Sequence, residues 1–426
     1  MRAGICQNYF PNGRLLILVR ADTAQTSSSG ENMAEAYLVG GARTPVGRYG
    51  GVLSSVRPDD LAAIVVAEAV RRARIDAALI DDIIFGAATQ AGEDNRNVAR
   101  MAALLAGLPD HVPGITVNRL CASGLSAITM AAQAIRAGDA DLMVAGGVES
   151  MTRAPWVQGK PDRAWAKPAP QFDTSIGWRF INPKLAARDK ATFSMSETAE
   201  EVARIDGITR DEADAFALRS QQRAAAAIDA GHFVDEIVGV PTKAGEVLVD
   251  EGPRRDTSLE GLAKLRPIVG GGSVVTAGNA SSLNDGASAV VVASGEAVKR
   301  YGLIPRARIV FGASVGLAPE IMGLGPVAAT EKVLARSGLR IEDLGAIELN
   351  EAFATQSLAC IRRLGLNDEI VNRDGGAIAL GHPLGSSGAR LVVTLLGRME
   401  RENAEHGLAT MCVGVGQGSA LILERV

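Results

Sequence analysis

The 426-residue sequence contains few of the residues on which several classes of protein depend. Aromatic residues make up 4% of the chain, which leaves little material for aromatic stacking platforms. The formal net charge is −4, so there is no basic excess to attract nucleic acid or an anionic membrane. No stretch approaches the roughly 20 consecutive apolar residues of a membrane-spanning helix. We therefore expect neither nucleic-acid nor membrane partners.

Cysteine and histidine are also scarce, with four of each in the chain. Four cysteines cannot form a disulfide scaffold in a protein of this length, and no CxxC motif or paired Cys/His spacing is typical of a zinc site. We expect no metal, no redox cofactor and a reducing location, the cytoplasm. Glycine is abundant instead, at 48 residues, and favours tight turns and close backbone packing.

The first 32 residues differ from the rest of the chain. They contain three arginines, no acidic residue before Asp22 and a serine-rich run at Ser27–Gly30. Their apolar run, Leu15–Val19, is shorter than the core of a signal peptide. A transit peptide is one interpretation, and translation from upstream of Met33 or a cloning scar is the other. We treat residues 1–32 as a non-native or disordered leader and exclude them from the fold prediction.

Beyond residue 32, short apolar runs that end in Gly or Ala alternate with stretches of helical period. Buried strands are predicted at Ile83–Gly86, Asp141–Gly147, Arg308–Phe311 and Ala346–Leu349, and a closing strand at Leu408–Leu423. Helices are predicted at Pro58–Arg74, Cys121–Ala137, Arg210–Ala230, Phe353–Leu364 and near Ser387–Met399. This alternation is typical of an α/β protein with helices on both sides of central sheets.

The same order of elements occurs twice in the chain, although the two copies have no similarity in amino-acid sequence. The first half is predicted to consist of two pieces, residues 33–150 and 267–300, and the second half to consist of residues 301–426. Residues 151–266 are richer in charge and proline and are predicted to form an inserted loop domain. Long insertions of this kind usually contact the substrate.

One histidine and two cysteines lie in distinctive, glycine-flanked contexts. Cys121 precedes apolar residues spaced by three and four, so we expect it at the N-terminus of a buried helix, where free N–H groups lower a cysteine pKa from its usual ~8.5. His382 lies within Gly375–Gly388, and Cys412 ends a strand before another glycine-rich turn. Cys/His pairs serve nucleophilic catalysis on acyl groups, and a second cysteine indicates a second proton-transfer task. An incidental histidine in a glycine-rich turn is the plainer alternative.

Four segments together resemble the thiolases, acyl-CoA:acetyl-CoA C-acyltransferases. They are Asn118–Ser126, Asn350–Ala354, Gly375–Gly388 and Cys412–Ala420, with secondary matches at Ala42–Pro45 and Thr276–Ser281. Ser175–Phe180 and Met322–Pro326 resemble the degradative branch, above all the 3-oxoadipyl-CoA thiolases. The resemblance implies a duplicated five-layer α-β-α-β-α core, a loop domain that covers CoA, and a homodimer or homotetramer. The implied reaction is ping-pong cleavage of 3-ketoacyl-CoA by CoA, or the reverse Claisen condensation, with CoA as a substrate rather than a cofactor.

The resemblance also implies a role for individual residues. Cys121 matches the nucleophile that becomes acylated, His382 the base that activates it, and Cys412 the acid/base at the acetyl Cα. Asn350 matches the residue that holds a water in an oxyanion hole beside His382, and the backbone N–H groups of Cys121 and Gly414 match the second oxyanion hole. The positions that match contacts to the substrate or CoA are Ser281, Met195, Met322, Phe353, Ala352, Ala280 and Leu283.

Two departures from the family pattern bear on the substrate. Ala122 follows the nucleophile where the family often has Ser, which the chemistry should tolerate because a backbone N–H does the work there. Ser194 precedes Met195 where the biosynthetic branch has a histidine, which argues against a dedicated acetoacetyl-CoA role. An acetoacetyl-CoA-specific biosynthetic thiolase, a ketoacyl synthase and a non-catalytic acyl-CoA binder are the alternatives. Arg179 is a candidate cation for a dicarboxylate substrate.

Overall fold

The computed structural model describes residues 34–426, and the leader predicted at 1–32 lies outside them. The strands are β1 (Ala36–Arg43), β2 (Gly47–Arg48), β3 (Asp82–Gly86), β4 (Gly114–Val117), β5 (Leu142–Ser150), β6 (Trp156–Gln158), β7 (Gln171–Asp173), β8 (Val240–Thr242), β9 (Gly245–Val247), β10 (Asn284–Ser294), β11 (Ala307–Gly316), β12 (Leu344–Leu349), β13 (His406–Val413) and β14 (Gln417–Arg425).

Twelve α-helices accompany these strands within the described residues. They are α1 (Pro58–Ala73), α2 (Val98–Leu105), α3 (Ser123–Ala137), α4 (Pro183–Ala186), α5 (Met195–Asp206), α6 (Arg210–Asp229), α7 (Leu259–Ala263), α8 (Gly295–Tyr301), α9 (Gly325–Ser337), α10 (Ala354–Leu364), α11 (Ala377–Leu380) and α12 (Leu384–Glu402). Three 3₁₀ turns lie at Ala77–Leu79, Pro319–Leu324 and Ile341–Asp343. None of the helices in this part of the chain has the length and apolarity needed to cross a membrane.

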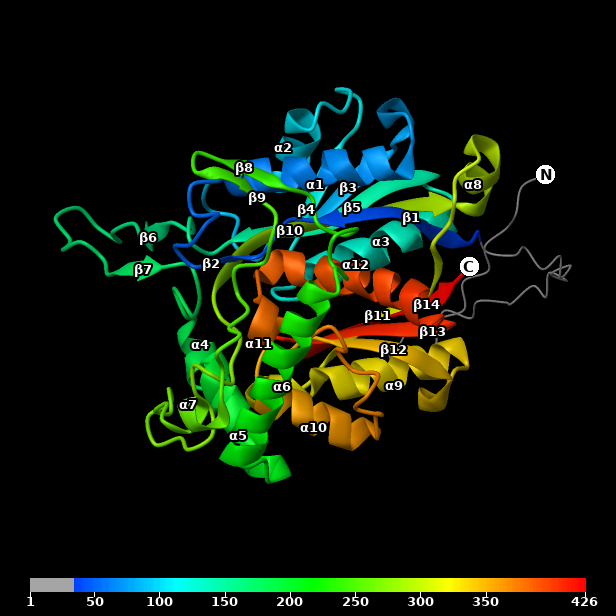
Figure 1. The fold of residues 1–426 in the computed structure, drawn as a ribbon. Helices are drawn as coiled ribbons and strands as arrows, with labels where there is room; N and C mark the ends of the chain where they lie inside the picture. Colours follow the sequence, from blue (N-terminus) through cyan, green and yellow to red (C-terminus); the bar gives the residue numbers. More distant parts are fainter. Residues whose placement is uncertain (1–33) are drawn as a thin grey trace, which may run out of the picture. The chain divides into compact units, whose positions relative to one another are not determined.

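The main sheet has the strand order β12-β13-β14-β11-β1-β10-β5-β3-β4, with β2 paired to β10. Strands β1 and β11 pair over only two positions, Tyr37 with Arg308 and Leu38 with Ala307. At this narrow junction the sheet divides into two layers (Figure 1). Helices α3 and α12 lie between the layers, since α12 contacts β5 and β10 on one side and β12 and β13 on the other. With α1 and α2 outside one layer and α9 and α10 outside the other, the predicted five-layer α-β-α-β-α fold is confirmed.

The middle layer brings the first turns of α3 and α12 into backbone contact. A Cβ on Gly124 would lie 2.7 Å from Gly385 O, and a Cβ on Gly388 would lie 2.4 Å from Leu125 N. Only glycine permits such an approach. Below these turns, the apolar face predicted for α3 is buried against α12 in a large apolar cluster. The glycines therefore place the N-terminal ends of the two helices side by side.

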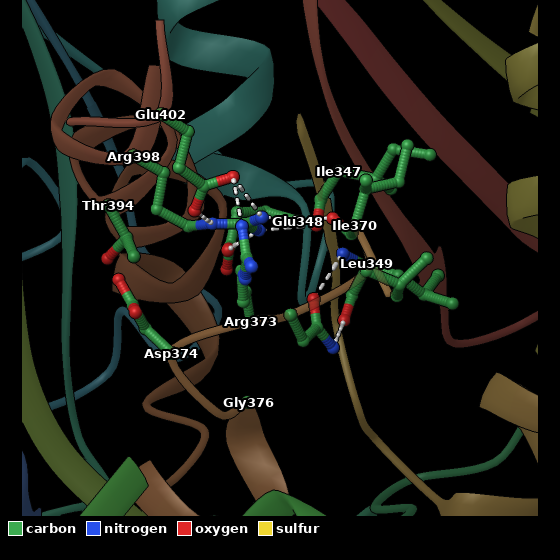
Figure 2. Close-up of polar contacts among 12 residues, drawn as sticks. Ile347, Glu348, Leu349, Ile370, Arg373, Asp374, Gly376, Thr394, Arg398 and Glu402 are labelled. Atoms are coloured by element: carbon green, nitrogen blue, oxygen red, sulfur yellow. Dashed lines mark hydrogen bonds and ion pairs between the residues drawn. The ribbon is translucent and has the colours of Figure 1, made fainter. Parts of the chain in front are cut away.

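Arg398 anchors the other end of α12 to the second sheet layer. Its guanidinium donates to Ile347 O at 2.9 Å, to Glu348 Oε1 at 2.8 Å and to Glu402 Oε1 at 3.0 Å. Figure 2 shows the arginine between the two carboxylates. Burial raises the pKa of Glu348 to about 7, against the lowering effect of the arginines. A buried pair bonded on so many sides fixes α12 against β12.

The structure corrects one predicted element. The closing strand expected at Leu408–Leu423 is the antiparallel pair β13 and β14, which reverses at Gly414–Gly416. Val415 and Gly416 have φ values of 62° and 70°, the left-handed conformation that a tight hairpin needs. A valine in that conformation is unusual, and its presence made the turn hard to recognise in an otherwise apolar run.

The predicted insertion is largely helical where it meets the C-terminal half. Helix α5 contacts α10, and α6 contacts both α10 and α11. Both helices begin with a capping box, Ser194 with Glu197 and Thr209 with Glu212, which satisfies free N–H groups at each start. Met195 is the first residue of α5, so the capping box of Ser194 and Glu197 fixes where this methionine lies against the core.

Candidate active site

Cys121 lies in a tight turn between β4 and α3. Leu120 has a left-handed backbone with φ of 46°, and Asn118 stabilises it by accepting from Leu120 N at 2.8 Å while donating to Ala88 O at 2.9 Å. Helix α3 begins at Ser123 without a side-chain cap, and Ser123 N donates to Leu120 O, directly before the cysteine, at 3.1 Å. Cys121 is partly exposed, whereas Cys360 and Cys412 are buried.

His382 lies two residues before α12, as Cys121 lies two residues before α3. Ser387 Oγ is 2.8 Å from Pro383 O, to which it donates its one proton, and 2.6 Å from His382 Nδ1. A hydroxyl with its proton already given to a carbonyl can only accept, so Nδ1 must be the donor in the second bond. The neutral imidazole is thus protonated at Nδ1, and its unprotonated Nε2 faces Nδ2 of Asn350 at 3.4 Å.

Asn350 and Cys412 lie near the carboxyl ends of the parallel neighbours β12 and β13. Asn350 N donates to Thr410 O at 3.0 Å, and Asn372 bonds both backbone groups of the preceding Leu349, at 2.8 and 2.7 Å. Oδ1 of the buried Asn350 has no hydrogen bond within the described residues and remains an acceptor for a ligand. The carboxyl ends of strands are where open α/β sheets bind ligands.

Cys121 lies close enough to Cys412 to affect the pKa of the Cys412 thiol. Burial raises the pKa of Cys412 well above its ordinary value, and the nearby Cys121 thiol raises it further. The backbone N–H of Gly414, two residues beyond Cys412, donates to Cys121 and lowers the pKa of that thiol. A Cβ on Gly414 would lie 3.1 Å from Leu120 Cδ1, which shows how closely the β13–β14 turn approaches the Cys121 turn.

The expectation that Cys121 has a lowered pKa is wrong for this structure. Although the residue is partly exposed, desolvation of its thiol is the largest effect and, with a smaller contribution from the carboxylate of Glu149, raises the pKa of Cys121 to about 11. The helix N-terminus and the Gly414 donor do not offset this desolvation. Burial and Arg390 lower the pKa of His382 to about 3, so this imidazole is neutral near pH 7. Near pH 7 the Cys121 side chain is therefore a thiol and the His382 imidazole is neutral.

Most of the predicted substrate residues come together around Cys412. The apolar cluster that includes this thiol contains Ala280, Met322, Ala352 and Phe353, with Met195 packed against it. Ser281 N donates to Ala352 O at 3.0 Å, which ties a further predicted residue to the cluster. Leu283 lies outside it and accepts from Tyr49 N at 3.0 Å. Arg179 is partly exposed and donates to Gly177 O at 3.2 Å.

Two buried residues that bear on the site escaped the sequence analysis. Ser387 lies within the quoted segment Gly375–Gly388, and a hydroxyl five residues after the histidine was its only signal. Glu149 lies near the end of β5 and accepts from Ala88 N, in the loop that supports the Cys121 turn, and from Gly385 N, in the turn that follows His382. An acidic residue that ends an apolar strand was a signal the sequence did contain.

The described residues also contain one group of potential metal ligands, Glu405, His406 and Glu424, whose ligand atoms lie within 4.8 Å of one another. Arg308 forms an ion pair with Glu424. His406 and Cys412 are six residues apart on β13, which is ~20 Å at ~3.4 Å per residue. This group is therefore remote from the cysteines.

A partly exposed thiol, a neutral imidazole and a second, buried thiol are the kinds of group that an acyltransferase with a cysteine nucleophile needs. Comparison with known families agrees: the model of the thiolase N-terminal domain matches residues 36–296, and that of the thiolase C-terminal domain matches residues 303–425. The chain belongs to the thiolase family. It is an acyltransferase whose reaction is the thiolytic cleavage of 3-ketoacyl-CoA, with CoA as a substrate.

Individual members of the family are also similar to this chain in sequence and in structure. The chain is 57% identical over 402 residues to the 3-oxoadipyl-CoA/3-oxo-5,6-dehydrosuberyl-CoA thiolase of Escherichia coli K12, which covers 92% of this chain and all of that protein. The structure matches the acetyl-CoA acetyltransferase of Bacillus anthracis with a TM-score of 0.86 at 40% identity, covering 92% and 99% of the two chains. It matches human mitochondrial 3-ketoacyl-CoA thiolase in complex with CoA with a TM-score of 0.87 at 38% identity, covering 92% and 98%.

Proposed function

We propose that this protein cleaves 3-oxoadipyl-CoA, a dicarboxylic 3-ketoacyl-CoA, into succinyl-CoA and acetyl-CoA. The 57% identity to a thiolase named for this substrate supports the proposal most directly. Thiolysis should be compared between 3-oxoadipyl-CoA and 3-oxohexanoyl-CoA, which has the same chain length without the terminal carboxylate. We expect kcat/KM to favour the dicarboxylate at least tenfold. Equal values, or a preference for acetoacetyl-CoA, would contradict the proposal.

We propose Arg179 as the cation that recognises the distal carboxylate. It lies beside Trp178, whose Nε1 donates to Phe193 O, two residues before Met195 of the apolar cluster. A charge-assisted hydrogen bond contributes about 1.5–3 kcal/mol, so Arg179→Gln should lower kcat/KM about tenfold or more for 3-oxoadipyl-CoA and leave 3-oxohexanoyl-CoA unchanged. Lys184→Gln, in the nearby α4, is the matched control and should change neither value.

We propose that Cys121 is the nucleophile and His382 its base. The Cys121 thiol loses its proton to Nε2 of His382, and the thiolate attacks the 3-keto carbon. The bond between C2 and C3 breaks, Cys412 protonates the acetyl-CoA enolate, and CoA attacks the acyl-Cys121 thioester. The neutral imidazole and the unprotonated Nε2 support this assignment. Cys121→Ser should abolish thiolysis while the protein stays folded, and substantial turnover of 3-oxoadipyl-CoA would contradict it.

We propose that Cys412 transfers the proton at the acetyl Cα, while Asn350 and the backbone N–H groups of Cys121 and Gly414 stabilise the two oxyanions. A single oxyanion-hole donor is worth about 2.7–4 kcal/mol in the transition state. Cys412→Ala should still form acyl-Cys121 but block the condensation with acetyl-CoA, which mass spectrometry of the intact protein can follow. The buried Cys360→Ala is the matched control. Normal carbon–carbon bond formation in Cys412→Ala would contradict the role.

We propose that no metal or other cofactor takes part, because the thiols, imidazole and backbone donors supply every step. Enzyme treated with EDTA should keep its full thiolase activity, and so should His406→Gln at the remote ligand group. Restoration of lost activity by a divalent cation would contradict the proposal. A cytoplasmic location suits a reaction that needs Cys121 and Cys412 in the reduced state.

We propose self-association into a homodimer or homotetramer. The β6–β7 hairpin projects from the rest of the described residues (Figure 1) and exposes Trp156 and Trp165, with Phe180 close by in sequence. Exposed large apolar side chains on one element indicate a protein contact, and a second copy of this chain is the partner we propose. Sedimentation should give a dimer or tetramer, and Trp165→Ser with Phe180→Ser should lower a tetramer to a dimer. A monomer would contradict the proposal.

The alternatives give different results in the same assays. An acetyl-CoA acetyltransferase is favoured by the likeness to the Bacillus anthracis structure, and it would prefer acetoacetyl-CoA. A ketoacyl synthase would decarboxylate malonyl-CoA, and a non-catalytic binder would release no CoA from any 3-ketoacyl-CoA. Ser194, in place of a biosynthetic-branch histidine before Met195, supports the degradative assignment.

A further inference from the structure

Glu149 is a buried carboxylate with three backbone donors. Its Oε2 accepts from Ala88 N and from Gly385 N, each at 2.9 Å, and its Oε1 accepts from Thr89 N at 3.1 Å. The side chain is 3% exposed and forms no ion pair within residues 34–426. A buried charge without a cation is costly, and such groups are often retained for function.

One set of these bonds leads to the Cys121 turn. Ala88 and Thr89 follow β3, and the carbonyl of Ala88 accepts from Nδ2 of Asn118 at 2.9 Å. Asn118 in turn accepts from Leu120 N at 2.8 Å, directly before Cys121. The loop that Glu149 binds therefore supports the residue that shapes the nucleophile turn.

The third bond leads to the His382 turn. Gly385 is the second residue of α12, and its N–H is one of the free donors of that helix start. The strand end approaches this turn so closely that a Cβ on Gly147 would lie 1.9 Å from Gly385 O. A negative charge at a helix N-terminus is also stabilised by the helix dipole. Glu149 thus fixes the start of the helix that follows His382.

We propose that Glu149 is a positioning residue of the thiolase reaction. It bonds both the Cys121 turn, from one half of the chain, and the His382 turn, from the other half, and so fixes the distance between the two turns. The proposal rests on the roles proposed for Cys121 and His382. It assigns Glu149 no contact with the substrate. A misplacement of about 1 Å between reacting groups can lower a rate ~100-fold, so a group that sets this spacing should act on kcat.

The charge of Glu149 gives a second expected effect: its loss should lower kcat but raise the reactivity of Cys121. The carboxylate of Glu149 raises the pKa of the Cys121 thiol, so its removal should make that thiol easier to ionise. Glu93, Asp94 and Arg153 line the same small cavity as Glu149, and the two turns that it bonds, with the strand end beside them, add His382, Cys121 and Cys412 as titratable groups. A variant without the charge should therefore be a slower enzyme with a more reactive cysteine.

Two substitutions of Glu149 test separately the charge of its side chain and its length. Glu149→Gln keeps the length, removes the charge and presents an NH₂ group to at least one backbone N–H. Glu149→Asp keeps the charge but is too short to bond both turns. We expect kcat for 3-oxoadipyl-CoA thiolysis to fall about 10- to 100-fold in both, with KM for CoA unchanged. Alkylation of Cys121 by iodoacetamide at pH 8 should be about tenfold faster in Glu149→Gln and unchanged in Glu149→Asp.

Asp94→Asn is the matched control, since it removes a second buried acid from the same cavity without contact to either turn. It should keep the wild-type kcat at pH 8 and the wild-type alkylation rate. A kcat within twofold of wild type in both Glu149 variants overturns the proposal. So does a loss of kcat in Glu149→Gln without faster alkylation. If Glu149→Gln does not fold, Glu149→Asp decides: low kcat with normal alkylation supports the proposal, and wild-type kcat overturns it. Cys121→Ser that still turns over would instead refute the nucleophile role.

Discussion

Ser387 Oγ lies 2.6 Å from Nδ1 of His382, and it can only accept in that bond because its own proton goes to Pro383 O. A neutral hydroxyl thus takes the place that a carboxylate occupies beside the histidine of a Ser-His-Asp triad. The serine fixes which ring nitrogen has the proton without raising the basicity of the ring as a negative charge would. The result is an imidazole that is neutral near pH 7 and whose Nε2 remains available as an acceptor.

We predict that Ser387→Ala lowers kcat about 10- to 100-fold, because the imidazole is then free to place its proton on Nε2. Ser386→Ala is the matched control: Ser386 lies in the same turn, is equally buried and bonds Ser288 Oγ at 2.9 Å. It should keep the wild-type kcat. Nitrogen-15 NMR of the labelled histidines should show the Nδ1–H form of His382 in wild type and a mixture in Ser387→Ala. The same tautomer in both proteins would contradict the prediction.

Cys121 should be alkylated before Cys360 and Cys412, and only slowly near neutral pH. It is partly exposed, whereas Cys360 and Cys412 are buried. Because its pKa is raised to about 11, the rate with iodoacetamide should rise about tenfold per pH unit from pH 7 to pH 10. Peptide mass spectrometry at each pH measures this directly. A plateau below pH 9 would mean a thiolate already formed, and equal labelling of Cys360 would contradict the accessibility argument.

His382 should make the fold less stable in mild acid. Its pKa is about 3 in the folded state against an ordinary value of 6.5. Below pH 6.5 the unfolded chain binds a proton that the folded chain does not, so the free energy of unfolding falls as pH falls toward 3. The loss at pH 5 is about 2 kcal/mol.

The variant His382→Asn lacks this group and should therefore gain about 2 kcal/mol relative to wild type between pH 7.5 and pH 5, as measured by urea unfolding. Glu149 and Glu348, whose pKa values are raised to about 7, act in the opposite sense but equally in both proteins. A constant difference between the two proteins over this pH range would mean that His382 titrates normally.

The close approach of β5 to α12 should not tolerate a methyl group. A Cβ on Gly147 would lie 1.9 Å from the carbonyl oxygen of Gly385, and neither backbone can move aside cheaply. We predict that Gly147→Ala lowers the free energy of unfolding by at least about 1–3 kcal/mol and lowers kcat as well. Gly270→Ala, where no atom lies within 4 Å of the added Cβ, is the control and should stay within about 0.5 kcal/mol of wild type. Urea unfolding and thiolysis assays test both variants, and equal stability would contradict the packing argument.

Local patterns predicted much of the fold. The apolar period after Cys121 gave α3, and buried runs gave β3, β5 and β12 to within a few residues. These features depend on neighbours in the sequence, since a helix or a buried strand imposes its own spacing on apolar residues. The turn that separates β13 from β14 could not be predicted, because Val415 adopts a left-handed backbone that its own side chain disfavours.

By itself, the sequence determined the thiolase family and the α/β fold class, because residue types within short segments are enough to identify them. From the same segments it predicted Cys121, His382 and Cys412 as reactive residues. Only the tertiary structure decided the ionisation of these residues. A helix start favours a thiolate locally, but desolvation by distant segments outweighs it and keeps Cys121 a thiol. The bonds of Glu149 and Ser387 likewise exist only after folding, since each depends on the spacing of backbone groups that the linear chain does not fix.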